Sequence, residues 1–463
     1  MTNASSGLSF SKLGLPTAQL DNLNNLGYQQ MTPIQAQALP VVLAGNDIIA
    51  QAKTGSGKTA AFALPLLNKV NQREFGTQGI ILCPTRELSS QVATEIRKLA
   101  RHINNIKVVT LCGGQPIGPQ IGSLEHGAHI VVGTPGRIED HLRKKTLKLT
   151  QVNTLVLDEA DRMLDMGFIE AMEYIISHTP EQRQSLFFSA TYPSDIAKLS
   201  KQFQQNPITV KVESLHDESA INQEFYICDK SQKMEAITIL LKLYRPNTAV
   251  VFCNTKHMVK NTNSFLNEHG ISSKALHGDM EQRDRDQTLI QFKQQSFCVL
   301  VATDVAARGL DIADLPAVIN MELPFDPEVY VHRIGRTGRA GKEGLAISVF
   351  SQNERKKLDE ISNYQNRKFD YEAIERLTIN DYSPLIAPNV CLCIAAGRKH
   401  KMRPGDILGA LTKNTTIDAK AVGKIDVLDF ISYVSVSRPV ADKALSQLLD
   451  GKIKGRKFKV RKV

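Results

Sequence analysis

The sequence has few cysteines, no long apolar run and no leader-like N-terminus, and each of these features excludes a class of protein. Its seven cysteines are scattered, without a CxxC pair or a nearby histidine set at zinc spacing, so neither disulfides nor a structural metal site are expected. No apolar run approaches the ~20 residues that cross a bilayer, which argues against a membrane protein. Met1–Leu13 lacks the basic cluster and apolar stretch of a secretory signal, and the sequence therefore favours the reducing cytoplasm.

Positive charge is concentrated near the C-terminus. The 463 residues carry a formal net charge of +10, and residues 385–463 hold 16 Lys and Arg against 6 Asp and Glu. The other residues hold 41 of each sign. A small basic module of this kind predicts a polyanion-binding appendix, with a solvated surface rich in lysine as the alternative.

Short apolar runs that alternate with helical patterns predict two α/β domains. Such runs are typical of strands buried on both faces of a parallel sheet. The first set comprises residues 47–53, 79–84, 129–133, 154–157 and 185–188, and the second comprises 249–253, 297–302, 317–320 and 344–350. We therefore expect two doubly wound domains, residues 1–212 and 223–375, joined by a linker at 213–222.

The order of elements changes from about residue 389. A strand at 390–395 is followed by a helix beginning at Pro404, two strands within 420–436, a helix around 441–448 and a closing strand at 457–463. Strand–helix–strand–strand–helix–strand is the ferredoxin-like order that RNA-recognition modules share. A small α+β domain of this type is therefore expected at residues 385–463.

The segment from Ala52 to Thr59 has the composition of a phosphate-binding loop. It follows a buried strand and opens a helix, and its glycines let backbone N–H groups approach phosphate oxygens. Lys58 would neutralise the β- and γ-phosphates, and the Thr59 hydroxyl would ligate Mg²⁺. The strict pattern has glycine in place of Ala52, and a chance Gly-rich turn is the alternative. The predicted ATP contacts in this loop are Ala52, Thr54, Gly55, Ser56, Gly57, Lys58 and Thr59.

Acidic residues follow the predicted strand at 154–157. At the carboxyl edge of a parallel sheet, Asp158 would hold Mg²⁺, directly or through water. Glu159 would orient and deprotonate an attacking water. A helix N-terminus enriched in acidic residues is the alternative, but the pairing with the phosphate loop favours a nucleotide-hydrolysing site.

These segments together resemble the DEAD-box RNA helicase family over nearly all of residues 10–350. The resemblance implies two RecA-like parallel-sheet domains, an ATP-dependent RNA helicase activity, ATP and Mg²⁺ as cofactors, and RNA as the substrate. It rests on the tetrapeptide Asp158-Glu159-Ala160-Asp161 and on further segments in family order: residues 32–35, 84–88, 113–114, 134–137, 189–191, 251–255, 303–311 and 332–339.

The resemblance also assigns roles around the nucleotide. Gln35, in the segment that begins at Thr32, would pair its amide with the adenine edge, which favours ATP over GTP. Phe10 would stack on the adenine, with packing onto the domain core as its alternative. Gly309 and Asp311 would complete the ATP contacts, Asp311 at the ribose. The residues expected to couple the γ-phosphate to the RNA surface are Asp161, Ser189, Thr191 and His332.

Two arginines of the second predicted domain would complete the catalytic site. Arg336 and Arg339 can clamp a γ-phosphate in a planar fork, and an arginine finger contributes about 10³–10⁵ in rate. The phosphate loop belongs to the first domain. Hydrolysis should therefore be slow while the lobes are apart and fast once they close, and we expect ATP and RNA each to favour the closed state.

The predicted RNA track consists of small residues, hydroxyls and a few arginines. Such residues suit sugar–phosphate contacts and not base edges, so the core should bind RNA with little sequence preference. The track comprises Pro84, Thr85, Arg86, Gly113, Gly114, Thr134, Pro135, Gly136 and Arg137 in the first domain, and Asn254, Thr255, Arg285 and Thr303 in the second.

The sheet of the predicted C-terminal domain offers few aromatics for base stacking. Period-two alternation places Phe430, Val434 and Val436 inside, and leaves Tyr433 as the one outward aromatic, beside Cys391 and Cys393. We therefore expect folded RNA, such as a hairpin, to bind through basic loops and edges. The basic residues predicted to contact it are Arg398, Lys399, Lys401, Arg403, Lys457 and Lys459.

A DEAD-box core followed by such a module resembles the bacterial DbpA subfamily. That resemblance implies recognition of a 23S ribosomal RNA hairpin in the peptidyl-transferase region and a role on large-subunit precursors, the pre-50S particles. The alternatives are an ATP-gated RNA clamp without unwinding, and a C-terminal module that binds an acidic protein.

Overall fold

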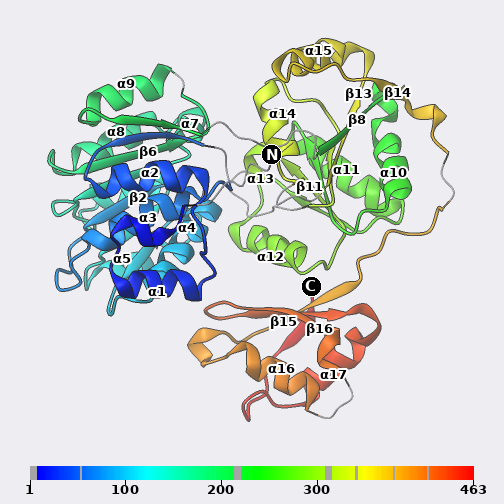
Figure 1. Ribbon diagram of the computed structural model, residues 1–463. Coiled ribbons are helices and arrows are strands. Elements are labelled where there is room, and N and C mark those ends of the chain that lie inside the picture. Colours follow the sequence, from blue (N-terminus) through cyan, green and yellow to red (C-terminus); the bar gives the residue numbers. More distant parts are fainter. Residues whose placement is uncertain are drawn as a thin grey trace, which may run out of the picture. The chain divides into compact units, whose positions relative to one another are not determined.

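The computed structural model describes residues 8–52, 55–192, 194–212, 221–307, 315–338, 343–378, 381–413 and 417–463. The described residues divide into two compact units, one ending at residue 212 and the other beginning at residue 221 (Figure 1).

The first unit is built on a parallel sheet whose two faces are covered by helices (Figure 1). Among its described residues, seven strands follow the order β3-β4-β2-β5-β6-β1-β7. The strands are β1 (Ile48–Gln51), β2 (Gly79–Leu82), β3 (Val108–Leu111), β4 (Ile130–Gly133), β5 (Thr154–Asp158), β6 (Gln184–Ser189) and β7 (Ile208–Lys211). The helices are η1 (Phe10–Leu13), α1 (Thr17–Asn25), α2 (Pro33–Leu43), α3 (Lys58–Lys69), α4 (Arg86–Leu99), α5 (Ile117–Leu124), α6 (Pro135–Arg143), α7 (Ala160–Asp165), α8 (Ile169–Ser177) and α9 (Ser194–Phe203).

Alternate residues of the central strands enter two separate cores. In β5, Val156 packs with helices α1 to α4, whereas Leu155 and Leu157 pack with α5 to α9. Because both faces of each strand are buried, the strand is apolar at every position, and the sequence contains a continuous apolar run.

The second unit contains another parallel sheet of the same design. In its described residues, seven strands follow the order β10-β11-β9-β12-β13-β8-β14. The strands are β8 (Ile221–Ile227), β9 (Ala249–Cys253), β10 (Ser273–Leu276), β11 (Val299–Thr303), β12 (Ala317–Asn320), β13 (Gly344–Phe350) and β14 (Tyr371–Ala373). The helices are η3 (Lys230–Gln232), α10 (Lys233–Tyr244), α11 (Lys256–Glu268), α12 (Gln282–Lys293), α13 (Asp304–Ala307), α14 (Pro327–Ile334), η4 (Gln352–Glu354), α15 (Arg355–Tyr364) and η5 (Ile374–Arg376). The two parallel sheets are the RecA-like pair expected from the sequence.

The strands that the sequence analysis did not identify are β8 and the four edge strands. The edge strands β3, β7, β10 and β14 each have one sheet neighbour. Several residues of β7 and β14 are exposed, and β3 and β10 contain half-buried positions, so these strands lack the fully buried apolar runs by which central strands were identified. Ile221 and Asn222, assigned to the linker from sequence, begin β8 instead. The linker residues 213–220 lie outside the described residues.

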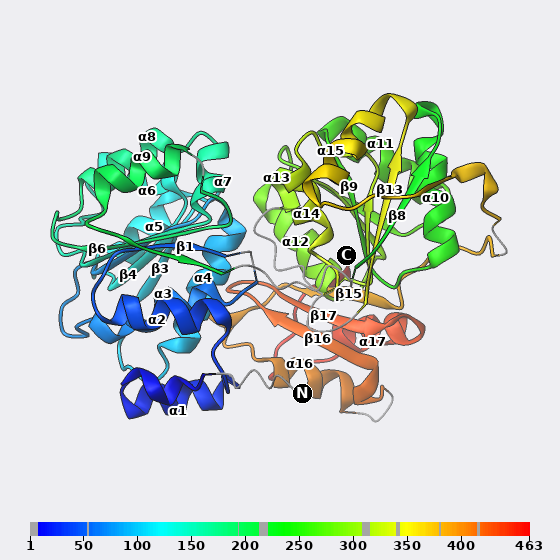
Figure 2. The ribbon, with the colours of Figure 1, turned by 45° about the horizontal axis from the view of Figure 1, so that its top comes forward.

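The C-terminal residues form an antiparallel sheet of order β16-β17-β15-β18, with α16 and α17 on one face (Figure 2). This arrangement confirms the ferredoxin-like order. The elements are β15 (Asn389–Ile394), η6 (Arg398–His400), α16 (Pro404–Thr412), η7 (Ala419–Ala421), β16 (Val422–Val427), β17 (Ser432–Ser437), η8 (Arg438–Val440), α17 (Ala441–Asp450) and β18 (Val460–Lys462).

The other face of this sheet is covered by helix α12. Cys391, Cys393 and Tyr433 form a buried cluster with Ile290 of α12. The carbonyl of Gln294 accepts hydrogen bonds from Asn389 Nδ2 (3.2 Å) and Ser435 Oγ (3.1 Å), and its side chain donates to Asp426 (3.0 Å). The alternation predicted for Cys391, Cys393 and Tyr433 is therefore correct, since their side chains face away from the domain's own core. The expectation that Tyr433 is solvent-accessible is wrong, because α12 covers it and leaves 3% of it exposed.

The prediction that Phe430 lies inside the domain is also wrong. Strand β17 begins only at Ser432, and Phe430 occupies the turn between β16 and β17, where period-two alternation does not apply. Its side chain is 63% exposed.

All seven cysteines lie among the described residues, and each is free and buried. In the same part of the chain, no group of three or more His, Cys, Asp and Glu residues is arranged to hold a metal ion. The described helices include none that is both long and apolar enough to cross a membrane.

Candidate nucleotide and RNA sites

The carboxyl edge of the first sheet gathers the residues predicted to handle the nucleotide. The phosphate loop follows β1, Asp158 ends β5 and Ser189 ends β6. These three strands are neighbours in the order β5-β6-β1, and their parallel direction brings all three ends to one edge. The sheet therefore brings together motifs that lie far apart in the sequence.

The phosphate loop is joined directly to the segment predicted to read adenine. Gln35 Nε2 donates to the Gly57 carbonyl (3.1 Å), and Gln35 Oε1 accepts from the Thr32 N–H (2.9 Å). Gly57 has a φ of +95°, and a Cβ there would lie 2.5 Å from Gln35 Nε2. Both the backbone conformation and the lack of space for a side chain therefore require glycine. This network fixes the Gln35 amide and leaves one N–H and one oxygen lone pair for a ligand.

Phe10 occupies the first core beside this segment. Its ring is 3% exposed and meets Tyr28 edge to face, with 6.1 Å between ring centroids. These contacts correspond to the core packing given as its alternative role, and stacking on adenine stays a prediction.

Lys58 begins helix α3 and is buried. Its ammonium donates to the Ala52 carbonyl at 2.9 Å, within the phosphate loop. A lysine held by one backbone oxygen keeps two N–H donors for phosphate oxygens. Thr59 follows it on the first turn of α3.

Asp158 is a buried carboxylate that is short of partners. Burial raises the pKa of Asp158 to about 6, against the opposing charge of Lys58. Among the described residues, its Oδ1 has no hydrogen-bond partner. A buried charged oxygen of this kind is costly unless a ligand satisfies it, and it suits a hard cation.

Glu159 is held in an unusual conformation next to Asp158. Its φ is +55°, in the left-handed region, and its Oε2 accepts a 2.7 Å hydrogen bond from Arg162 Nη1. Both side chains of this ion pair are buried. Arg162 was not among the residues selected from sequence, although an arginine three positions after a glutamate on a helical turn is a recognisable signal.

Asp161 connects this acidic segment to Ser189 and Thr191, as the coupling hypothesis requires. Its Oδ2 accepts from the N–H groups of Ala190 (3.1 Å) and Thr191 (2.9 Å) and from Thr191 Oγ1 (3.0 Å), while its own N–H donates to Ser189 Oγ (3.2 Å). Burial alone would raise the pKa of Asp161, but the hydrogen bonds from Thr191 and the charge of Lys58 hold it below its usual value. Four hydrogen bonds therefore join the acidic segment after β5 to the segment at the end of β6.

The other half of the same edge carries the predicted RNA residues. Segments 84–86, 113–114 and 134–137 follow β2, β3 and β4, which are neighbours in the order β3-β4-β2. The Arg86 guanidinium lies against the glycine pair, since a Cβ on Gly114 would be 1.5 Å from Arg86 Nη1. Arg137 Nη2 donates to the Gln115 carbonyl (3.0 Å). The three loops therefore support one another along a continuous strip.

Remaining members of this strip have local structural roles as well. Thr85 caps α4 by accepting from the Leu88 N–H (3.2 Å), and the Thr134 N–H donates to Leu111 (3.1 Å). Pro84 precedes this cap, and Pro135 and Gly136 lie in the first turn of α6.

The second sheet brings its predicted RNA residues to its own carboxyl edge. Asn254 and Thr255 follow β9, Thr303 ends β11, and Arg285 lies on α12 after β10. The strand order β10-β11-β9 makes these segments neighbours.

Arg333 is a buried organiser of this edge that sequence reasoning missed. Its guanidinium is 1% exposed as a side chain, and it donates to both oxygens of Asp304 (2.6 and 2.7 Å) and to Asn254 Oδ1 (2.8 Å). Further bonds reach Asn320 and the Glu322 carbonyl. Arg333 belongs to the segment His332–Arg339, which the sequence analysis did identify. In that segment Arg336 and Arg339 were assigned to the γ-phosphate, and Arg333 was given no role.

The remaining predicted residues of the second unit lie around helix α14. His332 Nε2 is 3.9 Å from Glu328, and Arg336 is buried just after the helix. Four predicted site residues lie outside the described residues: Thr54, Gly309, Asp311 and Arg339.

The basic residues predicted in the C-terminal domain are exposed on loops. Arg398 and Lys399 lie in η6, Lys401 follows it with a φ of +58°, and Arg403 precedes α16. Lys457 and Lys459 are exposed just before β18, so the predicted closing strand begins later than expected.

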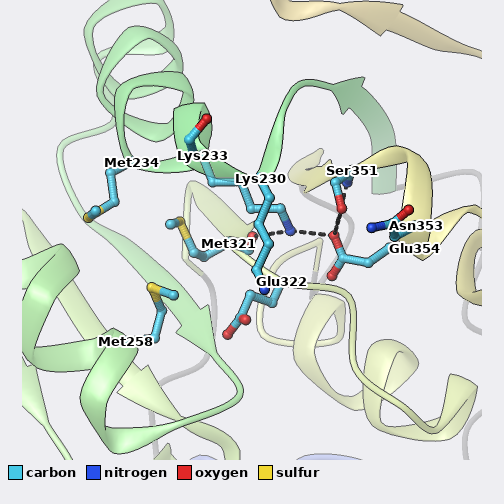
Figure 3. Close-up of a pocket in the computed structure, with 10 residues that line it drawn as sticks. Lys230, Lys233, Met234, Met258, Met321, Glu322, Ser351, Asn353 and Glu354 are labelled. Atoms are coloured by element: carbon cyan, nitrogen blue, oxygen red, sulfur yellow. Dashed lines mark hydrogen bonds and ion pairs between the residues drawn. The ribbon is translucent and has the colours of Figure 1, made fainter.

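A pocket of about 220 Å³ lies at the carboxyl edge of the second sheet (Figure 3). Met234, Met258 and Met321 form one wall, and on the other the buried ammonium of Lys233 bonds Glu354 (2.5 Å) and the Met321 carbonyl (3.2 Å). Because Lys233 already has these partners, the pair serves to hold η4 against α10.

Comparison with known proteins gives three family matches that together span most of the chain. Residues 32–199 match the DEAD/DEAH box helicase model, residues 232–341 match the helicase conserved C-terminal domain, and residues 391–462 match the DbpA RNA binding domain. The chain is 52% identical over 453 residues to the ATP-dependent RNA helicase DbpA of Escherichia coli (strain K12), covering 98% of this chain and 99% of that one.

Further similar proteins match about four fifths of the chain. The DEAD-box ATP-dependent RNA helicase CshA of Bacillus subtilis (strain 168) is 43% identical over 364 residues, covering 78% of this chain and 74% of that one. A solved structure of S. cerevisiae Dbp5 bound to RNA and ADP BeF3 is 30% identical, with a TM-score of 0.73, covering 79% of this chain and 96% of that one.

Proposed function

Since this chain belongs to the DEAD-box ATP-dependent RNA helicases and carries the RNA-binding domain of the DbpA type, we propose that it remodels 23S ribosomal RNA during assembly of the large ribosomal subunit in the cytoplasm. The observation that carries this proposal is the basic C-terminal domain appended to a core whose strand ends collect both nucleotide and RNA motifs.

The core residues fit hydrolysis of the β–γ bond of ATP. Lys58 and the loop amides would hold the phosphates, and Glu159 would take a proton from a water that attacks the γ-phosphorus. The new bond joins this water oxygen to phosphorus, the bond to the β-phosphate oxygen breaks, and ADP and phosphate leave. Arg162 would aim the Glu159 carboxylate, because it already fixes one oxygen at 2.7 Å.

Mg²⁺ fits the acidic edge of this site. The unpartnered Oδ1 of Asp158 and the hydroxyl of Thr59 would hold it, and when bound it would neutralise charge that develops on the phosphate oxygens. Lys58 would share that role through its own positive charge.

The second lobe would supply the remaining positive charge. Arg336 and Arg339 would approach the γ-phosphate when ATP and RNA favour the closed state, and the Asp161 network with Ser189 and Thr191 would report nucleotide occupancy to the RNA strip. Closing would bend one RNA strand and separate a short duplex, and hydrolysis would reset the lobes.

The test compares RNAs as activators of the full-length protein. We expect a 23S ribosomal RNA fragment containing the peptidyl-transferase hairpin to stimulate ATP hydrolysis at much lower concentration than an unrelated hairpin. Joint replacement of Lys399, Lys401 and Arg403 by Ala should remove that preference, whereas the same number of changes at Lys356, Lys368 and Lys413 should not. Equal stimulation by both RNAs would contradict the targeting proposal. A duplex-unwinding assay separates a helicase from an ATP-gated clamp, which would retain RNA without releasing a strand.

A further inference from the structure

An exposed aromatic side chain lies at the tip of the β16–β17 hairpin. The C-terminal domain contains three aromatic residues other than histidine. Tyr433 is covered by α12 and Phe458 is half-buried in the domain core, but Phe430 is largely exposed. A ring in this position contributes little to folding and is available to a ligand.

The hairpin tip is a rigid support. The Leu428 N–H donates to the Ile431 carbonyl (2.9 Å), which closes a two-residue turn of Asp429 and Phe430. Just beyond the turn, Ser432 Oγ donates to the Ala396 carbonyl (2.6 Å). The turn is therefore tied both to itself and to the end of β15.

A second loop, which is basic, is fastened to this tip. The backbone N–H groups of Arg398 and Lys399 donate to the carbonyls of Leu428 (2.8 Å) and Asp429 (2.9 Å). Gly397 makes the approach possible, since a Cβ at that position would lie 2.2 Å from the Leu428 carbonyl oxygen. The aromatic ring and the cations of η6 are thus parts of one fixed surface.

The charges on this surface favour a polyanion. Arg398 and Lys399 are exposed, and Lys401 is exposed beside them, with its carbonyl bonded by Lys454 Nζ (3.0 Å). Asp429 is the acidic residue in the turn, and it lies 3.4 Å from Arg398 in a pair whose side chains are both more than half exposed. Cations around an exposed ring match the backbone and the flat face of a nucleotide.

We propose that Phe430 stacks on one unpaired base of the RNA that the C-terminal domain binds, while Arg398 and Lys399 contact the adjoining phosphates. This inference rests on the proposed RNA-targeting function and adds a base-stacking contact to it. The stacking position is moved from the sheet face, which α12 covers, to the hairpin tip. An RNA with an unpaired nucleotide next to its helix is therefore preferred to a fully paired one.

The experiment uses full-length protein and a 23S peptidyl-transferase hairpin carrying 2-aminopurine, placed in turn at each unpaired position. One position should lose fluorescence on binding through stacking, and Phe430→Ala should abolish that loss. The Kd for this hairpin should rise about 5- to 150-fold in Phe430→Ala, because the stacking contact is lost. Its dependence on salt should stay unchanged, because a neutral ring releases no counterions, whereas Lys399→Ala should reduce the salt slope. Phe430→Trp should retain binding, and Phe75→Ala, at an exposed aromatic of the first unit, should have no effect.

Three results separate the possible failures. If the unmodified protein does not prefer this hairpin, the targeting proposal fails first. If it prefers the hairpin and Phe430→Ala binds equally well with the same quenching, the stacking inference is wrong, and the ring is left for a protein partner. If Phe430→Ala lowers the salt slope together with affinity, the change has disturbed the basic loop and stacking is not supported.

Discussion

The parallel sheets and the antiparallel sheet of this protein place functional residues by different rules. In the parallel sheets every strand ends at the same edge, so the loops that follow β1, β5 and β6, or β2, β3 and β4, are brought together. In the C-terminal sheet the strand ends alternate, so neither edge collects all the loops. One of its faces packs on its own helices and the other packs on α12.

The difference decides where chemistry can occur. A parallel edge presents backbone amides, hydroxyls and carboxylates from distant parts of the chain to one ligand. The antiparallel domain instead exposes the basic residues predicted to bind RNA on the segments between its strands and helices, so RNA would be contacted by several of these segments together. Helix α12 belongs to both settings, because it carries Arg285 of the predicted RNA track as well as Ile290, and Gln294 directly after the helix also contacts the C-terminal sheet.

Replacing Arg336 tests whether ATP hydrolysis at the carboxyl edge of the first sheet requires the second lobe. Arg336→Ala should lower the RNA-stimulated kcat for ATP about 10³-fold or more, because it removes the positive charge that meets the γ-phosphate in the transition state. Nucleotide affinity, measured with a fluorescent ATP analogue, should change little. Arg336→Lys should recover part of the loss at most, since lysine has no planar fork. An unchanged kcat would mean that the edge of the first sheet is sufficient by itself.

Glu159→Gln tests the edge of the first sheet alone. We expect kcat to fall about 10²- to 10⁴-fold, since the amide cannot accept a proton from the attacking water. Binding of ATP and RNA should persist, because the side chain keeps its size. Glu170→Gln, at an exposed position of α8, is the control. Comparable loss of ATP binding would instead indicate that Glu159 acts through the structure of the loop.

The same contrast explains which residue positions could be predicted from the sequence. Chain direction alone places Asp158 at the carboxyl edge of a parallel sheet, so the edge position assigned to it from sequence agrees with the structure. In the antiparallel domain the period-two pattern separated Val434 and Val436 from Cys391 and Tyr433 correctly. It could not predict that α12 covers the second set, because that contact joins segments more than a hundred residues apart.

Two further failures have local causes. Phe430 was misplaced because the alternation was continued beyond the end of a strand, into a turn. Arg162 and Arg333 were missed because arginines near phosphate motifs were interpreted as ligand contacts. Arg162 instead pairs with the buried Glu159, and Arg333 pairs with the partly exposed Asp304 and with a backbone carbonyl. The identity of a motif therefore predicts its place in the fold better than the partner of each of its side chains.

Arg333→Met tests what holds the carboxyl edge of the second sheet in place. Loss of the guanidinium would leave the Asn320 Oδ1 without its hydrogen bond and the Asp304 carboxylate, which is 22% exposed, without its ion pair. Breaking a fully buried pair costs about 3–5 kcal/mol, so for this partly exposed one we expect a loss of about 1–3 kcal/mol of unfolding free energy. Urea denaturation followed by circular dichroism measures this, with Arg355→Met, at an exposed position of α15, as the control. A loss below about 0.5 kcal/mol, typical of a surface substitution, would contradict the buried role.

Alkylation of Cys391 and Cys393 tests whether α12 covers one face of the C-terminal sheet in solution, and here we expect the smallest change. Burial raises the pKa of Cys391 to about 12, so its thiol is protonated and shielded near neutral pH, and alkylation in the native protein should be slow. Ile290→Glu would place a charge in the apolar cluster beside Cys391, Cys393 and Tyr433, and should speed their alkylation on the order of tenfold by favouring local opening. Mass spectrometry of the labelled peptides measures the rate, and Cys83 in the first unit provides an internal control. Leu243→Glu, on the exposed side of α10, should leave the rate unchanged. If both cysteines react rapidly before any substitution, the face is open in solution, Tyr433 becomes available to RNA, and the antiparallel sheet presents a stacking surface after all.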